Sequence, residues 1–518
     1  MTPRPKTGLR TKRGENDAML QVTNDRTHRL EAFEPQNAPR VTMYVCGPTV
    51  YDYSHLGHAK CYVSWDVVRR HLKFKGYQLV EAMNFTDIDD KIINRARESG
   101  EDWQTVAERF IHEFFVDMDA LGNERVELYP RATEHVPEMI AHIEGLIAKG
   151  FAYASGGDVY YAVTRFETYG ALSGRTLDQM QAGARVEIDE RKRHPMDFAL
   201  WKASKPGEPS WDSPWGPGRP GWHIECSAMV RKHLGDTIDI HTGGTDLLFP
   251  HHENEVAQSE ALTEKTFARY WLHNGFVAVG GEKMSKSLGN FTTIRELLKR
   301  YDPQTIRYFL LSMHYRQETD FADDAIQGAG TGLNRLRKGL GRYAEKLAEP
   351  TPEMRELAAK AEERFTAAMD DDFNTPRAIA VFFETQKALG ELIEKNPAAE
   401  ASAGHVIAKL FALAQVLGLD LAHQPEAKRD LTEQAPAIRA LYEELTSELQ
   451  TAVAPDEPVE LLNRLIEMRK DAKKAKNFGL SDQIRDRLKE AGVQLMDKPG
   501  GLTEWELLEA ATRPAARA

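Results

Sequence analysis

The sequence predicts an α/β protein that has a parallel-sheet core with an inserted connective segment, followed by a mainly α-helical C-terminal half. Three observations lead to this prediction. Near the start of the chain, a short apolar strand runs into a helix and then into a second strand. The same rhythm returns from Gly221 after a long polar interval. From about Ala325 onward, apolar residues such as Leu333, Leu336 and Leu340 recur at spacings typical of a helical bundle.

Composition limits the class of protein. The chain has 518 residues, of which 41% are hydrophobic and 28% are charged, as in an ordinary globular protein of about three or four domains. It contains no run of about 18 apolar residues, so we expect no membrane span. Its three cysteines are too few for a disulfide framework and fit a reducing, cytoplasmic environment. Because the net charge is −12, any contact with nucleic acid must use a local basic patch.

The first residues of the chain are basic. Residues 1–18 carry lysines and arginines but no apolar segment, which argues against a secretory signal. We expect a disordered basic extension there. Met19 is an alternative translation start, because the first strand-like sequence begins at this residue.

The first strand-to-helix unit is a candidate phosphate site. We expect a strand at Val41–Val45, a turn after it, and a helix over residues 57–74 that Ser54 caps. Free N–H groups and the helix dipole make such a helix start favourable for phosphates. This unit has no glycine-rich dinucleotide fingerprint and no Walker lysine. The candidate phosphate ligands are therefore the imidazoles of His55 and His58.

The elements that follow are expected from composition and turn residues. A second strand is predicted at Tyr77–Phe85, and a hairpin at Phe151–Tyr161 turns on two glycines. The polar chain from there to Arg219 is expected to be irregular. Further elements are expected in this order: a strand through Ile238 and Ile240, a helix that starts at Pro250, a strand at Phe276–Val279, a bundle seam from Leu333 to Leu347, and a Gly/Pro-rich tail after Ala491.

Four residues form a candidate metal set. His251 and Glu255 are four residues apart, which places them on one face of a helix. In a doubly wound fold, Cys46 and Cys226 would lie at the same edge of the sheet. Two thiolates, one imidazole and one carboxylate suit zinc. A surface ion pair and buried small cysteines remain the alternatives, and Cys61 is interpreted as a buried apolar residue.

A lysine-rich loop is a second candidate for phosphate chemistry. Residues 280–290 place Lys283 and Lys286 among small, flexible residues. Ammonium groups of this kind can stabilise a polyphosphate in a transition state and then release it. An exposed polar loop is the alternative, and the presence of His55 and His58 upstream favours the phosphate interpretation.

These motifs carry a family resemblance. His55-Leu-Gly-His58 resembles the HIGH signature, and Lys283-Met-Ser-Lys-Ser287 resembles the KMSKS signature, of class I aminoacyl-tRNA synthetases. Cys46, Cys226 and the His251/Glu255 pair narrow the resemblance to the cysteinyl-tRNA synthetases. The similarity extends from about Met19 to Asp497.

The resemblance implies a reaction and its residues. A Rossmann-type core would bind ATP, with Mg²⁺, and L-cysteine, form cysteinyl-adenylate and pyrophosphate, and transfer cysteine to the terminal adenosine of tRNA(Cys). One zinc ion per subunit, held by the four-residue metal set, would select the cysteine thiolate over the serine hydroxyl. The implied ATP-binding residues are His55, His58, Lys283, Met284, Ser285, Lys286 and Ser287, of which the two histidines and two lysines are catalytic. The implied cysteine-binding residues are Gly47, Thr86, Trp222, His241 and Asp246.

The resemblance also implies a domain order. A disordered extension at 1–18 would precede the core. The segments expected after it are 19–128 and 218–275 as the two halves of the core, 129–217 as an inserted acceptor-end domain, 276–325 as a stem-contact region, 326–430 as a tRNA-binding bundle, and 431–518 as an anticodon-binding domain. Between Arg464 and Lys489, nine basic residues against four acidic ones form a local patch that can hold phosphates, with a solvated helix face as the alternative from charge alone. The implied anticodon contacts are Lys473, Phe478, Asp482 and Asp497.

Two other functions fit parts of the sequence. A mycothiol-pathway ligase, which joins cysteine to an amino sugar, resembles the catalytic half but lacks the C-terminal tRNA-binding region. A noncatalytic RNA-binding protein would be expected to lose some of the motifs that are intact here. Asn94 stands where some family members have a lysine, so we do not infer their persulfide-forming activity. We expect a cytoplasmic monomer.

Overall fold

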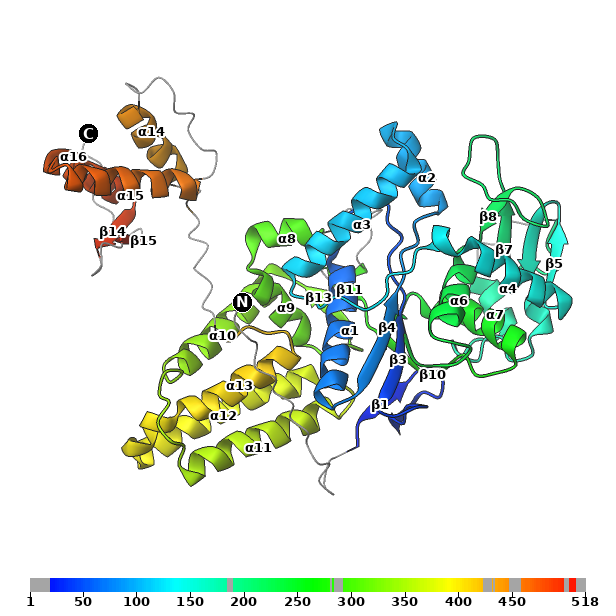
Figure 1. The fold of residues 1–518 in the computed structure, drawn as a ribbon, viewed down its shortest axis with the longest axis horizontal. Helices are drawn as coiled ribbons and strands as arrows, with labels where there is room; N and C mark the ends of the chain where they lie inside the picture. Colours follow the sequence, from blue (N-terminus) through cyan, green and yellow to red (C-terminus); the bar gives the residue numbers. More distant parts are fainter. Residues whose placement is uncertain are drawn as a thin grey trace, which may run out of the picture. The chain divides into compact units, whose positions relative to one another are not determined.

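The computed structural model describes residues 19–183, 190–279, 282–283, 292–422, 431, 434–446, 458–497 and 503–508. The chain divides into two compact units, Met1–His423 and Gln424–Ala518, and each is described by itself (Figure 1). The expected basic extension at residues 1–18 lies outside the described residues. In the part of the chain that is described, no helix combines the length and the apolarity that a membrane crossing requires.

A four-stranded parallel sheet forms the core of the first unit. Its strands follow the order β10-β9-β3-β4, with β3 at Arg40–Val45, β4 at Gln78–Met83, β9 at Ile238–Gly244 and β10 at Ala268–Asn274. The interior strand β3 is buried after its first residue, because neighbouring strands flank it and helices cover the sheet. This confirms the predicted α/β core with its parallel sheet. The edge strand β10 was not predicted, because polar residues interrupt its apolar sequence.

Helices connect and cover these strands (Figure 1). The helix α1, Leu56–Phe74, crosses from β3 to β4. The other helices of the core are α2 at Asp90–Ser99, α3 at Trp103–Ala120, α6 at Trp222–His233 and α7 at Glu253–Thr263. The helix expected to start at Pro250 begins later, because Phe249 has an extended backbone within the short helical segment η3, Leu248–His252, and α7 starts only at Glu253.

The inserted segment contains a second sheet. It begins with η1 at Ala132–His135 and α4 at Val136–Ala148, and also holds η2 at Val163–Arg165 and α5 at Leu177–Gly183. Four antiparallel strands follow the order β5-β6-β7-β8: Ala152–Ser155, Asp158–Tyr161, Phe198–Ala203 and Gly218–Pro220. The predicted hairpin is confirmed, since β5 pairs with β6 across two glycines of positive φ. The expectation of irregular chain up to Arg219 was wrong, because β7 and β8 pair with partners far away in the sequence.

Smaller strands and a helical bundle complete the first unit. A three-stranded sheet has the order β12-β11-β13, with strands at Glu282–Lys283, Val277–Val279 and Thr319–Phe321, and a hairpin joins β1, Gln21–Asn24, to β2, Arg29–Ala32. The helices are α8 at Ile294–Arg300, α9 at Pro303–Leu311, α10 at Asp323–Gly341, α11 at Pro352–Met369, α12 at Thr375–Lys395, η5 at Pro397–Ser402 and α13 at Gly404–Val416. The predicted seam is buried at Leu333, Leu336 and Leu340, but Leu347 is exposed because α10 ends at Gly341.

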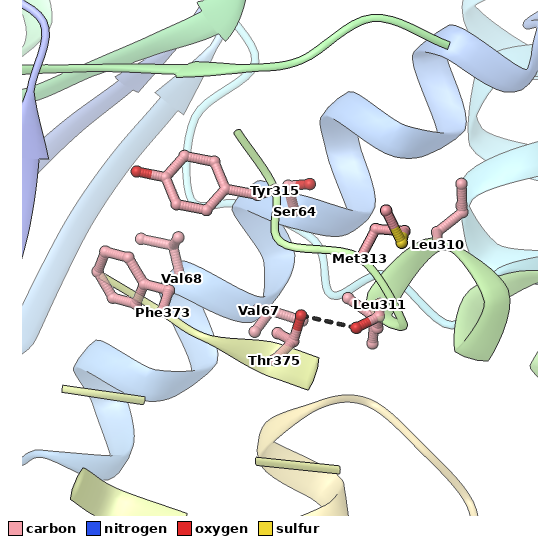
Figure 2. Close-up of a pocket in the computed structure, with 9 residues that line it drawn as sticks. All are labelled: Ser64, Val67, Val68, Leu310, Leu311, Met313, Tyr315, Phe373 and Thr375. Carbon is pink, nitrogen blue, oxygen red and sulfur yellow. Dashed lines mark hydrogen bonds between the residues drawn. The ribbon is translucent and has the colours of Figure 1, made fainter. Parts of the chain in front are cut away.

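A small, mostly apolar pocket lies where the bundle meets the core (Figure 2). Phe373, just before α12, lies among side chains of α1 and of the chain after α9, and its ring centroid is 6.5 Å from that of Tyr315. The Thr375 hydroxyl donates a 2.8 Å hydrogen bond to the carbonyl oxygen of Leu311. These contacts fasten the first residues of α12 to the end of α9.

The second unit has its own apolar core. It consists of α14 at Ala435–Thr446, α15 at Pro458–Lys474, α16 at Phe478–Glu490, β14 at Val493–Asp497 and β15 at Thr503–Leu507. The tail expected after Ala491 is instead an antiparallel hairpin in which Leu495 pairs with Trp505. Residues 498–502, which connect the two strands in the sequence, lie outside the described residues.

Candidate active site

Four buried donor groups converge at the carboxyl ends of the parallel strands. Cys46 directly follows β3, Cys226 lies on α6, His251 lies on η3, and Glu255 lies on α7. One ligand atom from each residue lies within 4.8 Å of the other three, and all four residues are buried. The structure therefore brings together the four residues that the sequence proposed as one metal set.

The spacing of these donors can be compared with a tetrahedral zinc site. Metal–ligand bonds of about 2.3 Å to sulfur and about 2.05 Å to nitrogen or oxygen give ligand–ligand edges of about 3.8 Å for S–S, 3.6 Å for S–O and 3.3 Å for N–O. The structure has 3.9 Å between the two Sγ atoms of Cys46 and Cys226, and 3.5 Å between Cys46 Sγ and Glu255 Oε1. His251 Nε2 lies 3.1 Å from Glu255 Oε1. The donor set therefore fits zinc in both chemistry and dimensions.

The charges of these groups also suit a cation. Burial would raise the pKa of Glu255, but the imidazoles of His241 and His251 lower it to about 2. Burial would likewise raise the pKa of Cys226, whereas the hydrogen bond with Cys46 and the nearby His251 lower it to about 7. Burial raises the pKa of the Cys46 thiol. A carboxylate and a readily formed thiolate are thus held where water does not compete.

A second set of donors shares two of these residues. Cys46, His241, His252 and Glu255 also lie within 4.8 Å of one another. His241 Nε2 is 2.9 Å from Glu255 Oε2, and His252 Nε2 is 3.3 Å from Cys46 Sγ. These imidazoles therefore orient two members of the first set. His252 is a residue that the sequence reasoning missed, although its place next to His251 was a signal.

Three of the residues predicted to bind cysteine, Gly47, Trp222 and Thr86, differ in their contacts and burial. A Cβ on Gly47 would lie 1.6 Å from the carbonyl oxygen of Asn84, so the close approach of the two strand ends requires glycine here. Trp222 is 36% exposed, and its ring stacks on His251 at a centroid distance of 4.2 Å. Thr86 is buried and donates a 2.7 Å hydrogen bond to Glu225.

The other two predicted pocket residues differ in their exposure. His241 is fully buried and stacks on Trp271 with a centroid distance of 4.3 Å, and it contacts Glu255 at Oε2 whereas His251 contacts Oε1. Asp246 is exposed in the turn after β9. Of the five predicted residues, Trp222 therefore combines direct contact with a metal-set residue and partial exposure.

The two histidines of the HLGH motif cap α1. His55 Nδ1 accepts a hydrogen bond from the His58 backbone N–H, and His58 Nδ1 accepts one from the His55 N–H, each at 3.3 Å. The expected cap was Ser54, but the imidazoles perform this role as a reciprocal capping box. Because both Nδ1 atoms are acceptors, each neutral ring carries its proton on Nε2. The rings stack with centroids 3.8 Å apart, so they present two like donors side by side.

The lysine motif is described only at its start. The backbone of Lys283 belongs to β12 and pairs with Ala278 of β11. Met284, Ser285, Lys286 and Ser287 lie outside the described residues. The chain is described again from Thr292, where α8 approaches the start of α1 through the bridge between Thr293 and His55.

The predicted anticodon residues all belong to the second unit. Asp497 accepts hydrogen bonds from Arg469 Nη1 at 2.8 Å and Nη2 at 3.0 Å, and from Lys473 at 2.6 Å. These hydrogen bonds hold the pKa of Asp497 well below its usual range. Phe478 is 62% exposed at the start of α16, and Asp482 pairs with Arg485 at 2.8 Å. Phe478 thus offers an open aromatic ring, whereas Asp497 is already engaged by two cations.

Two family models match the chain. The model "tRNA synthetases class I (C) catalytic domain" matches residues 32–331, more than half of the chain, and the model "DALR domain" matches residues 364–422. A curated cysteine–tRNA ligase of Gloeothece citriformis is 48% identical over 505 residues, covering 94% of this chain and 99% of the relative. The chain belongs to the cysteine–tRNA ligases.

Other relatives agree with this assignment. A cysteine–tRNA ligase of Geobacter sulfurreducens is 49% identical over 498 residues, with coverage of 94% and 99%. Among solved structures, a methionyl-tRNA synthetase of Mycobacterium tuberculosis in complex with methionyl-adenylate has a TM-score of 0.57 at 16% identity, covering 73% of this ligase and 91% of that chain. At this identity the likeness concerns the fold, which is the class I synthetase fold with its helical C-terminal region.

Proposed function

We propose that this ligase activates L-cysteine with ATP and transfers it to tRNA(Cys). In the first step, a cysteine carboxylate oxygen attacks the α-phosphorus of ATP, the bond to the bridging oxygen breaks, and pyrophosphate leaves. In the second step, a ribose hydroxyl of the terminal adenosine of the tRNA takes the cysteinyl group and releases AMP. The observation that carries the proposal is the cluster of Cys46, Cys226, His251 and Glu255, of which Cys46 lies nine residues before the HLGH motif.

Zinc is the proposed resident metal, one ion per subunit. When bound, it supplies a soft cation that prefers a thiolate to a hydroxyl, which is the difference between cysteine and serine. Cys46, Cys226, His251 and Glu255 would hold it, while His241 and His252 keep Glu255 and Cys46 oriented. Such selection at the binding step would make hydrolytic editing unnecessary.

The cysteine side of the pocket is proposed to use the predicted residues. Gly47 lets the two strand ends approach closely, Trp222 stacks on His251, and the buried Thr86 hydroxyl is held by Glu225. His241 acts on this pocket through Glu255, since its Nε2 bonds to the carboxylate. Asp246, exposed after β9, is proposed to contact the substrate from the solvent side.

The phosphate side rests on the HLGH motif. His55 and His58 each carry a proton on Nε2 when neutral, and an N–H donor suits a phosphate oxygen. Lys283 and Lys286, with Met284, Ser285 and Ser287, are proposed to stabilise the departing pyrophosphate, and Mg²⁺ accompanies ATP. Placing phosphate donors at the start of α1 also uses the positive end of its helix dipole.

The tRNA contacts are proposed from the domain order. Residues 129–217 would meet the acceptor end, residues 276–325 and the bundle at 326–430 the body, and the second unit the anticodon. In the second unit, Phe478 could stack an unpaired base, and Asp482 could contact a base edge. Lys473 and Asp497 would act together, since they are already hydrogen-bonded. We propose that the ligase acts as a cytoplasmic monomer.

A pyrophosphate-exchange assay tests the activation step. Exchange of labelled pyrophosphate into ATP is measured with cysteine and with serine, before and after removal of zinc by a chelator. We expect exchange with cysteine but not with serine, and we expect the exchange to be lost when the chelator removes the metal. Zinc-loaded protein that supports no cysteine-dependent exchange would refute the proposal. Charging assays that compare tRNA(Cys) with an amino sugar then identify the acceptor.

The fourth metal ligand has a separate test. Glu255→Ala removes the carboxylate that lies 3.5 Å from Cys46 Sγ and 3.1 Å from His251 Nε2. We expect a lower zinc content, measured by elemental analysis after dialysis, and a weaker discrimination against serine. Glu260→Ala is a matched control on the same helix, since Glu260 pairs with Arg26 away from the centre. Undiminished zinc affinity in Glu255→Ala would remove Glu255 from the set.

A further inference from the structure

Arg295 lies at a junction of three segments near the HLGH motif. It is the second residue of α8. Its Nε donates a 3.1 Å hydrogen bond to Asp117 Oδ1, and its Nη2 donates to Glu113. Its guanidinium also lies over the ring of Tyr53, 4.6 Å from the centroid. One side chain therefore binds α8 both to α3 and to the residue that precedes Ser54.

The acidic partners are fixed in the core. Glu113 and Asp117 are four residues apart on α3 and thus face the same side. Asp117 is only 1% exposed and also accepts a hydrogen bond from the Ser54 backbone. Phe110, one turn earlier on the same face, packs edge-on against Tyr53 at 5.4 Å. The face of α3 thus supports both Arg295 and the chain just before α1.

The start of α8 is joined directly to the start of α1 through the backbone. The Leu56 N–H donates to the carbonyl oxygen of Thr292 at 3.2 Å, and the Ile294 N–H donates to that of Ser54 at 2.9 Å. Thr293 and His55 form the bridge between these two hydrogen bonds. The peptide groups on both sides of His55 are therefore held by residues 292–294, which Arg295 in turn fixes.

We propose that Arg295 is a positioning residue for adenylate formation, acting through residues 292–294 on the backbone of His55. This inference rests on the proposed activation of cysteine by ATP. His55 caps α1 with its Nδ1 atom, so the direction of its Nε2–H depends on where its backbone lies. Guanidinium, carboxylates and aromatic ring together give a rigid, planar fit that a flexible side chain cannot reproduce.

The consequence is specific to one step. Arg295 touches neither the metal set nor Trp222 in any described contact, so cysteine selection does not depend on it. A displacement of about 1 Å in a catalytic group can lower the rate of the chemical step on the order of 100-fold. Loss of Arg295 should therefore reduce the rate of adenylate formation without a comparable change in cysteine binding.

Arg295→Met and Arg295→Lys test the inference in the zinc-loaded full chain. We expect Arg295→Met to lower kcat for cysteine-dependent pyrophosphate exchange by roughly 10- to 100-fold, with the KM for cysteine and the zinc content within about twofold of wild type. Arg295→Lys keeps a charge but loses the planar fork, so its kcat should lie between those of wild type and Arg295→Met. In rapid-quench experiments, the rate of the adenylate burst should fall while its amplitude stays.

Arg125→Met is the matched control. Arg125 also pairs with an α3 carboxylate, Asp119 at 2.6 Å, and lies over an α3 ring, that of Phe115 at 3.6 Å, but it contacts neither α8 nor the start of α1 in any described interaction. Its exchange kinetics should match wild type. If Arg295→Met does not fold, Glu113→Gln provides the same test, because it removes one charge and leaves the arginine in place.

Three outcomes separate the explanations. A burst of normal rate and reduced amplitude in Arg295→Met would mean a purely structural role and would overturn the inference. A parallel loss in Arg125→Met would assign the effect to general stabilisation of α3 and would also overturn it. If wild-type protein itself gives no cysteine-dependent exchange, the proposed function fails, and that result is distinct from a failure of Arg295 alone.

Discussion

The buried histidine His142 should make the folding stability of the inserted segment sensitive to acid. It lies on α4 and is 1% exposed. Its Nε2 is 3.2 Å from the carbonyl oxygen of Gln258 on α7, the helix that also carries Glu255. This contact requires the proton on Nε2, and Nδ1 has no hydrogen-bond partner among the described residues. Burial lowers the pKa of His142 from 6.5 to about 4.

The sign and size of the effect follow from proton binding. Between pH 6.5 and pH 4, the unfolded chain holds a proton on this imidazole and the folded chain does not. Acidification therefore favours the unfolded state, and the contribution of His142 to stability is lost as the pH falls through this range. The interval between the two pKa values corresponds to a maximum loss of about 3 kcal/mol.

Urea denaturation of wild type and His142→Gln at pH 7, 6, 5 and about 4 measures this loss. Glutamine places an N–H near the position of Nε2 but does not titrate. As the pH falls, the unfolding free energy of wild type should therefore decrease relative to that of the variant, by up to about 3 kcal/mol. His112→Gln, at an exposed position on α3, serves as the control. Parallel loss of stability in wild type and His142→Gln would refute the reasoning.

Three further substitutions probe other parts of the ligase. Gly47→Ala should abolish cysteine-dependent exchange and lower the zinc content, because its Cβ would meet the Asn84 carbonyl at 1.6 Å; normal exchange would contradict this. Gly390→Ala on α12, where a Cβ meets no atom within 4 Å, should raise the unfolding free energy by up to about 1 kcal/mol in a denaturation curve. Asp497→Asn should leave exchange unchanged and reduce tRNA charging, because Arg469 loses its bidentate partner; equal loss of both activities would argue against separate roles.

Elements that depend on a few neighbouring residues could be predicted from the sequence. The apolar run of β3 and the glycine pair of the β5–β6 hairpin could be recognised within a few residues. The missed strands β7, β8 and β10 pair with strands that are separated from them by a long stretch of sequence, and the missed hairpin β14–β15 lies where glycine and proline in the connecting sequence indicated an irregular tail. Their own side chains mix polar and apolar residues, so periodicity alone does not identify them.

The sequence predicted the four residues of the metal set but missed the neighbouring His252. Cys46, Cys226, His251 and Glu255 could be grouped because a parallel sheet brings its strand ends together, and the structure does so. His252 was missed because adjacent residues usually point in different directions, whereas the kinked η3 segment turns both imidazoles toward the same centre.

The capping box of α1 gives a physical reason why two histidines can be proposed as phosphate donors, where nucleotide folds commonly use a glycine-rich loop. A glycine loop offers backbone N–H groups to phosphate, and a helix start leaves such groups unpaired. In this ligase, the imidazoles of His55 and His58 satisfy two of those backbone N–H groups through Nδ1. The donor capacity is thereby moved from the backbone to Nε2, at the outer end of each ring. Cys46 lies nine residues earlier, on the turn that leads into this helix, so one rigid strand–turn–helix unit carries both a metal ligand and the donors proposed for phosphate.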